Sequence, residues 1–133
     1  MVINFKIGDT MNKFDLINNI DINKKESWNN KLFITIDIDW VIDEVLFDTV
    51  QLLKKNNSKA TFFVTHVSDI LDDLEQDPNF ELGIHPNLNY LLNGDFRYGK
   101  NYREVIDYYL KFVPSAKSIR SHSLTINSLI LEK

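Results

Sequence analysis

Short apolar segments alternate along the chain with segments of helical character, and this alternation limits the possible folds more than any other feature. Three continuous runs of apolar and β-branched residues are typical of strands buried on both faces, at 32–36, 59–65 and 80–84. A segment predicted to be helical follows each run, at 41–56, 68–75 and 102–112. Strands that alternate with helices indicate a parallel sheet joined by right-handed crossovers. The sequence therefore predicts an α/β fold built from parallel βα repeats.

The two ends of the chain depart from this alternation. Residues 1–30 are polar and lack a regular apolar period, and we interpret them as a lead-in segment before a βα domain at 31–133. A short fourth strand is predicted at 117–120, and an apolar segment that begins at Ile126 is cut off by the end of the sequence. We therefore expect the last element to be unfinished.

Length, charge and composition limit the partners and the location of the protein. The 133 residues, of which 44% are hydrophobic, suffice for one domain with its own core. The net charge of -4 offers no basic surface, so neither nucleic acid nor anionic lipid is expected as a partner. No secretory signal or membrane span is evident, and a cytoplasmic location is expected. Because the chain has no cysteine, a bound metal would need Asp, Glu or His ligands.

Side chains that bind metals or transfer protons lie at the carboxyl ends of the predicted strands. The three histidines, His66, His85 and His122, each lie at or just beyond such an end, and Asp37 and Asp39 follow the first strand. Because the ends of parallel strands lie on one edge of a sheet, we expect these side chains to converge. Helix capping is the alternative role for Asp39, whereas Asp37 ends an apolar strand and needs a cation or hydrogen-bond donors.

Four short motifs follow one another along the chain: TIDID at 35–39, KATFFV at 59–64, ELGIHPN at 81–87 and RSHS at 120–123. Together and in this order they resemble the polysaccharide deacetylase family, which is also called the NodB-homology domain or carbohydrate esterase family 4. The resemblance covers about residues 32 to 125, and KATFFV after an aspartate-ended strand is its most specific part. The nearest pattern is that of deacetylase-like proteins of surface-polysaccharide assembly.

This resemblance implies a fold, an activity and a set of roles. The fold is a distorted TIM-type barrel, and the activity is hydrolysis of an N- or O-acetyl group on a glycan by a water that a divalent metal, first of all Zn²⁺, activates. Carried over by position, Asp37 resembles the general base, Asp39 the first metal ligand and His85 the first histidine ligand. Arg120 resembles the arginine that orients the base. The implied substrate is an acetylated precursor of a surface polysaccharide.

The chain departs from the family pattern at two ligand positions. The family's aspartates are adjacent, whereas one residue separates Asp37 from Asp39 here, so their two roles could be exchanged. The family's second histidine ligand corresponds to Asn89, which is a weaker ligand. The third metal ligand therefore stays open among His66, His122 and Asn89, with a slight preference for His66 because it follows the more clearly predicted strand.

The resemblance also implies that part of the family's domain lies outside this sequence. The family's later motifs, including a histidine that acts as general acid, are expected beyond residue 133, and a complete barrel needs about 250 residues. We therefore expect a truncated barrel with an exposed strand edge, which pairs with a missing C-terminal half or forms a homo-oligomer. Whether this N-terminal part is active by itself stays open.

Two other functions compete with a deacetylase. The residues from Asp37 to Val41 also fit the DxDx[TV] motif of haloacid-dehalogenase-type phosphatases, in which Asp37 would be the nucleophile, Asp39 the acid/base and Mg²⁺ the cofactor. That function gives no role to the histidines or to Arg120. The third possibility is a non-catalytic remnant that still binds carbohydrate but lacks the later catalytic motifs.

Overall fold

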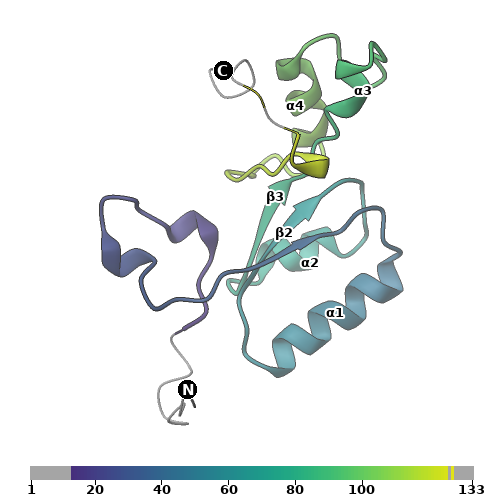
Figure 1. Cartoon of the computed structure of the whole chain (residues 1–133). Coiled ribbons are helices and arrows are strands. Elements are labelled where there is room, and N and C mark those ends of the chain that lie inside the picture. The colour runs from purple at the N-terminus through teal and green to yellow at the C-terminus, as the bar shows by residue number, and fades with distance from the viewer. Residues whose placement is uncertain (1–12, 126, 128–133) are drawn as a thin grey trace, which may run out of the picture.

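The computed structural model describes residues 13–125 and 127, and its centre is a three-stranded parallel sheet (Figure 1). The strands follow one another in the order β1-β2-β3, and they are β1 (Ile34–Asp37), β2 (Ala60–Val64) and β3 (Phe80–Ile84). The first residues of the three strands are paired, so the carboxyl ends lie together at one edge. The predicted α/β fold with a parallel sheet is confirmed, whereas the truncated barrel stays a prediction.

Two helices connect the strands. α1 (Asp43–Lys55) joins β1 to β2, and α2 (Leu71–Gln76) joins β2 to β3. Acidic residues in the first turn of α1 and lysines in its last turn interact favourably with the helix dipole, while Leu46 and Val50 are buried in the core. The helix predicted at 68–75 is present but begins at Leu71.

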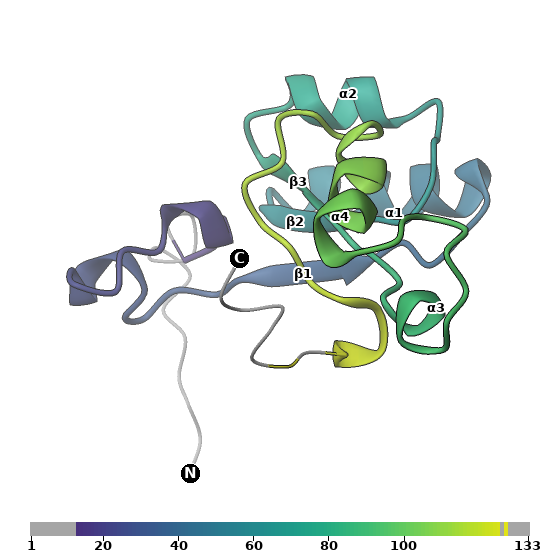
Figure 2. The same ribbon diagram turned by 90° about the horizontal axis from the view of Figure 1, so that it is seen from above.

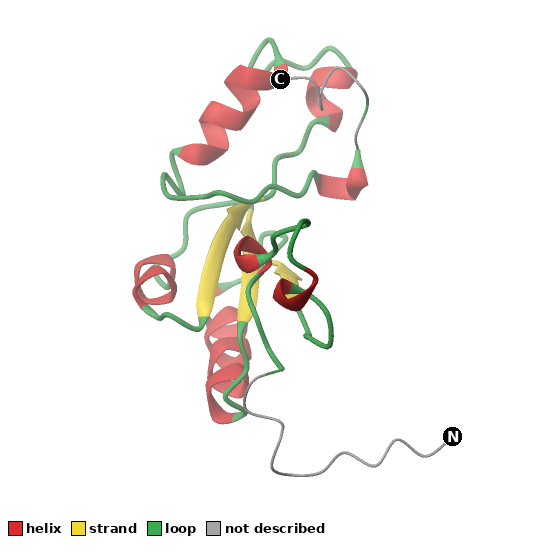
Figure 3. Cartoon of the chain, turned by 90° about the vertical axis from the view of Figure 1, so that its left-hand side faces the viewer, coloured by secondary structure: helices red, strands yellow, loops and turns green. Residues whose placement is uncertain are grey.

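Three further helices lie beyond the carboxyl ends of the strands (Figure 3). They are α3 (Asn89–Leu92), α4 (Tyr102–Leu110) and a 3-10 helix, His122–Leu124. The short α3 was not predicted, because four residues are too few to show a helical period. In the described part of the chain, none of the helices has the length and apolar character that a membrane span requires.

Tyr109 of α4 fixes the chain that leaves β3. Its side chain is buried, and its hydroxyl oxygen accepts a hydrogen bond of 3.1 Å from the backbone N–H of Asn87. Burial raises the pKa of Tyr109 to about 12, although the bond from Asn87 acts in the opposite direction. The phenol therefore stays neutral, and α4 holds the loop that follows β3 in a fixed position.

The two faces of the sheet have different characters. One face carries the apolar core, to which β2 and β3 contribute Ala60, Phe62, Val64, Phe80, Leu82 and Ile84. Since side chains alternate along a strand, the residues between them face the opposite way, and these include Thr35, Asp37, Thr61, Glu81 and Gly83. β1 is only half-buried, in contrast to the expectation, whereas β3, which has the segment around Ile119 beside it, is buried. The polar side chains of the second face are thus available for a site.

The segment predicted as a fourth strand lies beside β3 but forms a single bridge, between Ile84 and Ile119. The backbone N–H of Ile84 donates to the carbonyl of Ser118 at 3.0 Å, and the N–H of Arg120 donates to the carbonyl of Ile84 at 3.1 Å. A parallel ladder would next require an N–H from residue 86, which is a proline and has none. The expectation of a strand at 117–120 was therefore wrong: Pro86 ends the pairing on one side of the bridge, and on the other side the N–H of Ser118 does not bond to the carbonyl of Leu82. The apolar segment predicted from Ile126 lies almost wholly outside the described residues.

Residues 13–33 pack to one side of β1 (Figure 2) and contain two 3-10 helices, Ile17–Asn19 and Lys25–Ser27. Asp15 is their main polar anchor, since its buried carboxylate contacts the ammonium groups of Lys31 and Lys59. Burial tends to raise the pKa of Asp15, but hydrogen bonds from Lys31, Asn19 and the Leu16 backbone together lower it to about 2. The division into a lead-in segment and a βα domain stays a prediction.

Replacement of Asp15 with asparagine should lower the free energy of unfolding at pH 7 by about 2 kcal/mol, from the difference between a pKa of 3.8 and one of about 2. A lowered pKa stabilises the folded protein above pH 4, and this stabilisation is lost as the pH falls towards 2. The difference between wild type and Asp15→Asn in urea unfolding should therefore shrink over that range. The control is Asp21→Asn, in the same segment, whose carboxylate is more exposed and should cost about 0.5 kcal/mol or less. A difference that does not change with pH would contradict the role of the charge.

Candidate metal centre

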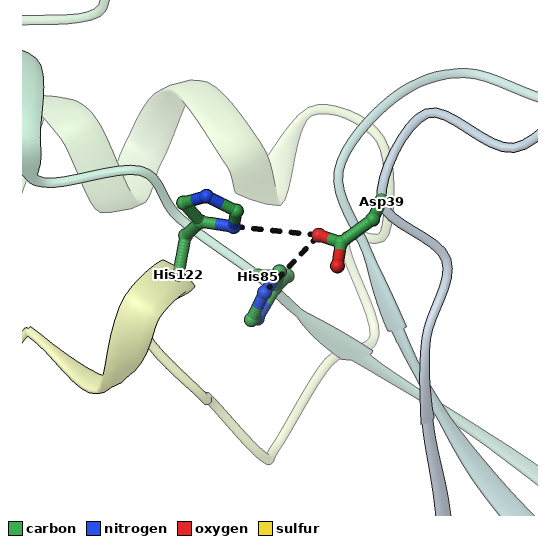
Figure 4. Close-up of side chains that lie close together, drawn as sticks. All are labelled: Asp39, His85 and His122. Carbon is green, nitrogen blue, oxygen red and sulfur yellow. Dashed lines mark ion pairs between the residues drawn. The ribbon is translucent and has the colours of Figure 1, made fainter.

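Three side chains from distant parts of the chain meet at the carboxyl edge of the sheet: Asp39, His85 and His122 (Figure 4). Asp39 follows β1, His85 directly follows β3, and His122 begins the last 3-10 helix. The Oδ1 atom of Asp39 lies 3.5 Å from Nε2 of His85 and 3.3 Å from Nδ1 of His122. One candidate ligand atom from each residue lies within 4.8 Å of the others. Metal bonds of about 2 Å place ligand atoms roughly 3 Å apart, so one small ion fits between them.

The hydrogen bond made by His85 determines which of its nitrogens faces the other two residues. Nδ1 lies 2.7 Å from the backbone carbonyl of Arg120, and since a carbonyl can only accept, Nδ1 carries the hydrogen. Nε2 of the neutral ring then has a lone pair, which faces Oδ1 of Asp39 at 3.5 Å and Oδ2 of Asp37 at 3.9 Å. A buried lone pair opposite two carboxylates is unfavourable unless a metal ion lies between them or Nε2 carries a proton. A metal-binding histidine commonly donates its other ring N–H to a backbone carbonyl in this way.

Pro86 explains why the Arg120 carbonyl is available to His85. In the parallel pairing beside β3, that carbonyl would accept the backbone N–H of residue 86, and proline has none. The pairing continues one step later, where the N–H of His122 donates to the carbonyl of Pro86 at 2.9 Å. The interruption therefore orients the ring of His85, and the pairing that resumes after it holds His122 at the edge of the sheet.

A different observation indicates a cation beside His122. Among the described residues, its Nδ1 is the buried side-chain nitrogen or oxygen that forms no hydrogen bond, although it lies 3.3 Å from Oδ1 of Asp39. Its ring packs edge to face against His85 and against Trp40, with both pairs of ring centroids 5.4 Å apart. A divalent metal would satisfy this nitrogen. The donor set of two imidazoles and a carboxylate suits Zn²⁺ and similar ions better than Mg²⁺.

Asp37 lies beside this group and is held by Arg120. Nη1 of Arg120 donates to Oδ1 of Asp37 at 2.9 Å, and Nη2 donates to the hydroxyl oxygen of Thr35 at 2.7 Å. The guanidinium group also lies over the ring of Phe63, 4.3 Å from its centroid. Three contacts thus fix Arg120. The second carboxylate oxygen of Asp37, Oδ2, faces His85. Sequence reasoning missed Thr35 and Phe63, although they share a strand face with Asp37 and could have been found by alternation.

The side chains of His66 and Asn89 contact other parts of the protein. Both ring nitrogens of His66 contact the protein: Nδ1 lies 2.9 Å from the hydroxyl oxygen of Thr65, and Nε2 lies 3.2 Å from the carbonyl of Val41. The side-chain oxygen of Asn89 accepts a hydrogen bond of 2.8 Å from Thr125. Of the two histidines considered for the third ligand, the structure brings His122 and not His66 into a group with Asp39 and His85 among the described residues.

The fold and the cluster together define a parallel α/β protein with a carboxylate and two imidazoles at the carboxyl edge of its sheet. The family described as WbmS-like polysaccharide deacetylase matches residues 34–133, and the chain belongs to this family. The family resemblance inferred from the four motifs is confirmed. A comparison with curated proteins gave no match.

A solved structure supports the same assignment. It is described as a candidate polysaccharide deacetylase, WbmS, involved in O-antigen biosynthesis, from Bordetella bronchiseptica. The two sequences are 44% identical, the TM-score is 0.84, and the match covers 92% of this chain and 50% of that protein. The chain therefore spans about half the length of the solved relative.

Proposed function

We propose that the protein is a metal-dependent deacetylase that removes an N- or O-acetyl group from a sugar of a surface-polysaccharide precursor. The observation that carries this proposal is the meeting of Asp39, His85 and His122 beside the ion pair of Asp37 and Arg120. The relative from Bordetella is described as involved in O-antigen biosynthesis, which supports a substrate of that class. A cytoplasmic location, where such precursors are made, remains the expectation from the sequence.

Each side chain has a defined part in this proposal. Asp39 supplies a carboxylate oxygen, and His85 and His122 supply Nε2 and Nδ1 as ligands. A bound divalent ion would polarise the acetyl carbonyl and lower the pKa of a water molecule. Asp37 would accept the proton of that water through the oxygen that Arg120 does not bind. Arg120 keeps the Asp37 carboxylate oriented, as its bonds to Thr35 and Asp37 fix its own position.

The phosphatase hypothesis is less well supported. It requires Asp37 as an unhindered nucleophile and Mg²⁺ on oxygen ligands, whereas Arg120 binds Asp37 and two imidazoles line the cluster. The family match also favours a deacetylase. The carbohydrate-binding remnant differs from the main proposal only in lacking turnover, so an activity measurement separates them.

The test is acetate release from N- and O-acetylated sugar oligomers, measured on the protein loaded with Zn²⁺ or Co²⁺ and on the same protein after chelation. We expect release that depends on the metal and returns when the metal is restored. Phosphate release from a phosphate monoester with Mg²⁺ would indicate the phosphatase instead. Metal and glycan binding without any acetate release would leave the non-catalytic remnant as the function.

A further inference from the structure

The turn that carries Asp39 has a strained backbone. Asp39 and Trp40 are two consecutive non-glycine residues with positive φ angles of 32° and 59°. This left-handed region is unfavourable for residues with a Cβ atom, and it persists only where surrounding contacts hold it. The turn is closed by a backbone hydrogen bond of 2.7 Å from Val41 to Ile38. The position of the Asp39 carboxylate therefore depends on what holds this turn against the sheet.

Three further hydrogen bonds involve Thr65 and His66 at the end of β2. Two of them contact the turn, and the third joins Thr65 to His66. The backbone N–H of Trp40 donates to the hydroxyl oxygen of Thr65 at 3.1 Å. Nε2 of His66 lies 3.2 Å from the carbonyl of Val41, which can only accept, so Nε2 carries the hydrogen. Nδ1 of His66 is then an acceptor and takes the hydroxyl hydrogen of Thr65 at 2.9 Å. Each donor in this series of hydrogen bonds has one acceptor. The series ties both sides of the strained turn to the end of β2.

We infer that Thr65 and His66 are positioning residues that clamp the Asp39–Trp40 turn and so place Asp39 for metal binding. The inference rests on the proposed metal centre. Thr65 is buried and His66 is half-buried, and each uses its side chain on the turn. His66 thus acts on the centre through the backbone and Asp39, and not as a ligand.

The test compares Co²⁺ binding, followed by visible absorption, in the wild-type chain and in Thr65→Val, which keeps the shape of threonine without its hydroxyl. Loss of a residue that orients a ligand typically costs about 10-fold to 100-fold in metal affinity, and we expect a loss in this range with a changed absorption spectrum. Thr65→Ser keeps the hydroxyl and should restore affinity and spectrum. Thr49→Val is the matched control, because the Thr49 hydroxyl bonds within α1, to Val45, away from the site. Wild-type affinity in Thr65→Val, or an equal loss in Thr65→Ser, would overturn the clamp.

A double variant tests whether the two residues act as one unit. His66→Leu removes both ring contacts, and we expect it to weaken Co²⁺ binding by a similar factor. Thr65→Val combined with His66→Leu should cost little more than the larger single loss, since both substitutions break the same chain of hydrogen bonds. Losses that multiply would show that the residues act independently and would contradict the clamp.

Hydrogen exchange separates failure of the clamp from failure of the metal centre. In the metal-free protein, the Trp40 amide should exchange at least about 10-fold faster in Thr65→Val than in wild type, because its acceptor is lost. If the wild-type chain binds no Co²⁺ but this amide is deprotected as expected, the metal centre is wrong and the clamp on the turn stands. If Co²⁺ binds and the amide is unchanged by the substitution, the clamp is wrong and the centre stands.

Discussion

Replacement of His85 with alanine should remove the metal from the protein almost completely. His85 is the most buried member of the cluster, with 3% of its side chain exposed, and its tautomer is fixed by the Arg120 carbonyl. Its loss removes one of three proposed ligands beside the Asp37 carboxylate. We expect about one metal ion per wild-type chain, and an affinity loss beyond the roughly 100-fold that an outer residue costs. Elemental analysis after dialysis against Zn²⁺ measures this directly.

The control for this prediction is Asn89→Ala. Asn89 takes the place of the family's second histidine ligand, but in the structure its side-chain oxygen accepts a hydrogen bond from Thr125. We therefore expect Asn89→Ala to keep its metal, and His122→Ala to lose it. Equal metal content in wild type, His85→Ala and Asp39→Ala would exclude the centre altogether. Loss in Asn89→Ala with retention in His122→Ala would assign the third ligand to Asn89.

The sheet could be predicted from sequence because its determinants are local. The run at 80–84 corresponds to β3 without a shift, and each residue of that strand is buried. The fourth strand could not be predicted in the same way. Whether the pairing at Ile119 extends beyond Arg120 depends on a hydrogen-bond donor at position 86, and Pro86 belongs to another segment. An apolar run indicates that a strand is possible, but the partner decides whether it forms.

The convergence of Asp39, His85 and His122 also followed from the sequence, because parallel strands bring their carboxyl ends to one edge. The choice between His66 and His122 did not. Both follow predicted strands, and His66 follows the more clearly predicted one. What separates them is the hydrogen bond from His66 to the Val41 carbonyl, 25 residues away, which no periodicity indicates. How clearly a strand is predicted gives no information on where the imidazole ring of the following histidine points.

Substitution of Asp37 with asparagine should abolish most of the acetate release while leaving the metal in place. The asparagine side chain keeps an oxygen that can accept the Arg120 hydrogen bond but cannot take a proton, so a general base is lost. Loss of such a group typically costs about 10²-fold to 10⁴-fold in rate. Asp37 lies 3.9 Å from the nearest nitrogen of His85, next to the cluster but not among its three members. Elemental analysis and acetate release, measured on the same preparations, check both halves of the prediction.

Two companion variants make this result specific. Arg120→Lys keeps the positive charge but cannot bind Asp37 and Thr35 together, and we expect lower activity with normal metal content. Asp39→Asn should instead weaken metal binding, because it removes the anionic ligand. If Asp37→Asn lost the metal and Asp39→Asn kept it, the two carboxylates would have exchanged roles. The sequence left that choice open, and the geometry favours Asp39 as the ligand because its Oδ1 lies closer to His85 than any oxygen of Asp37 and also reaches His122.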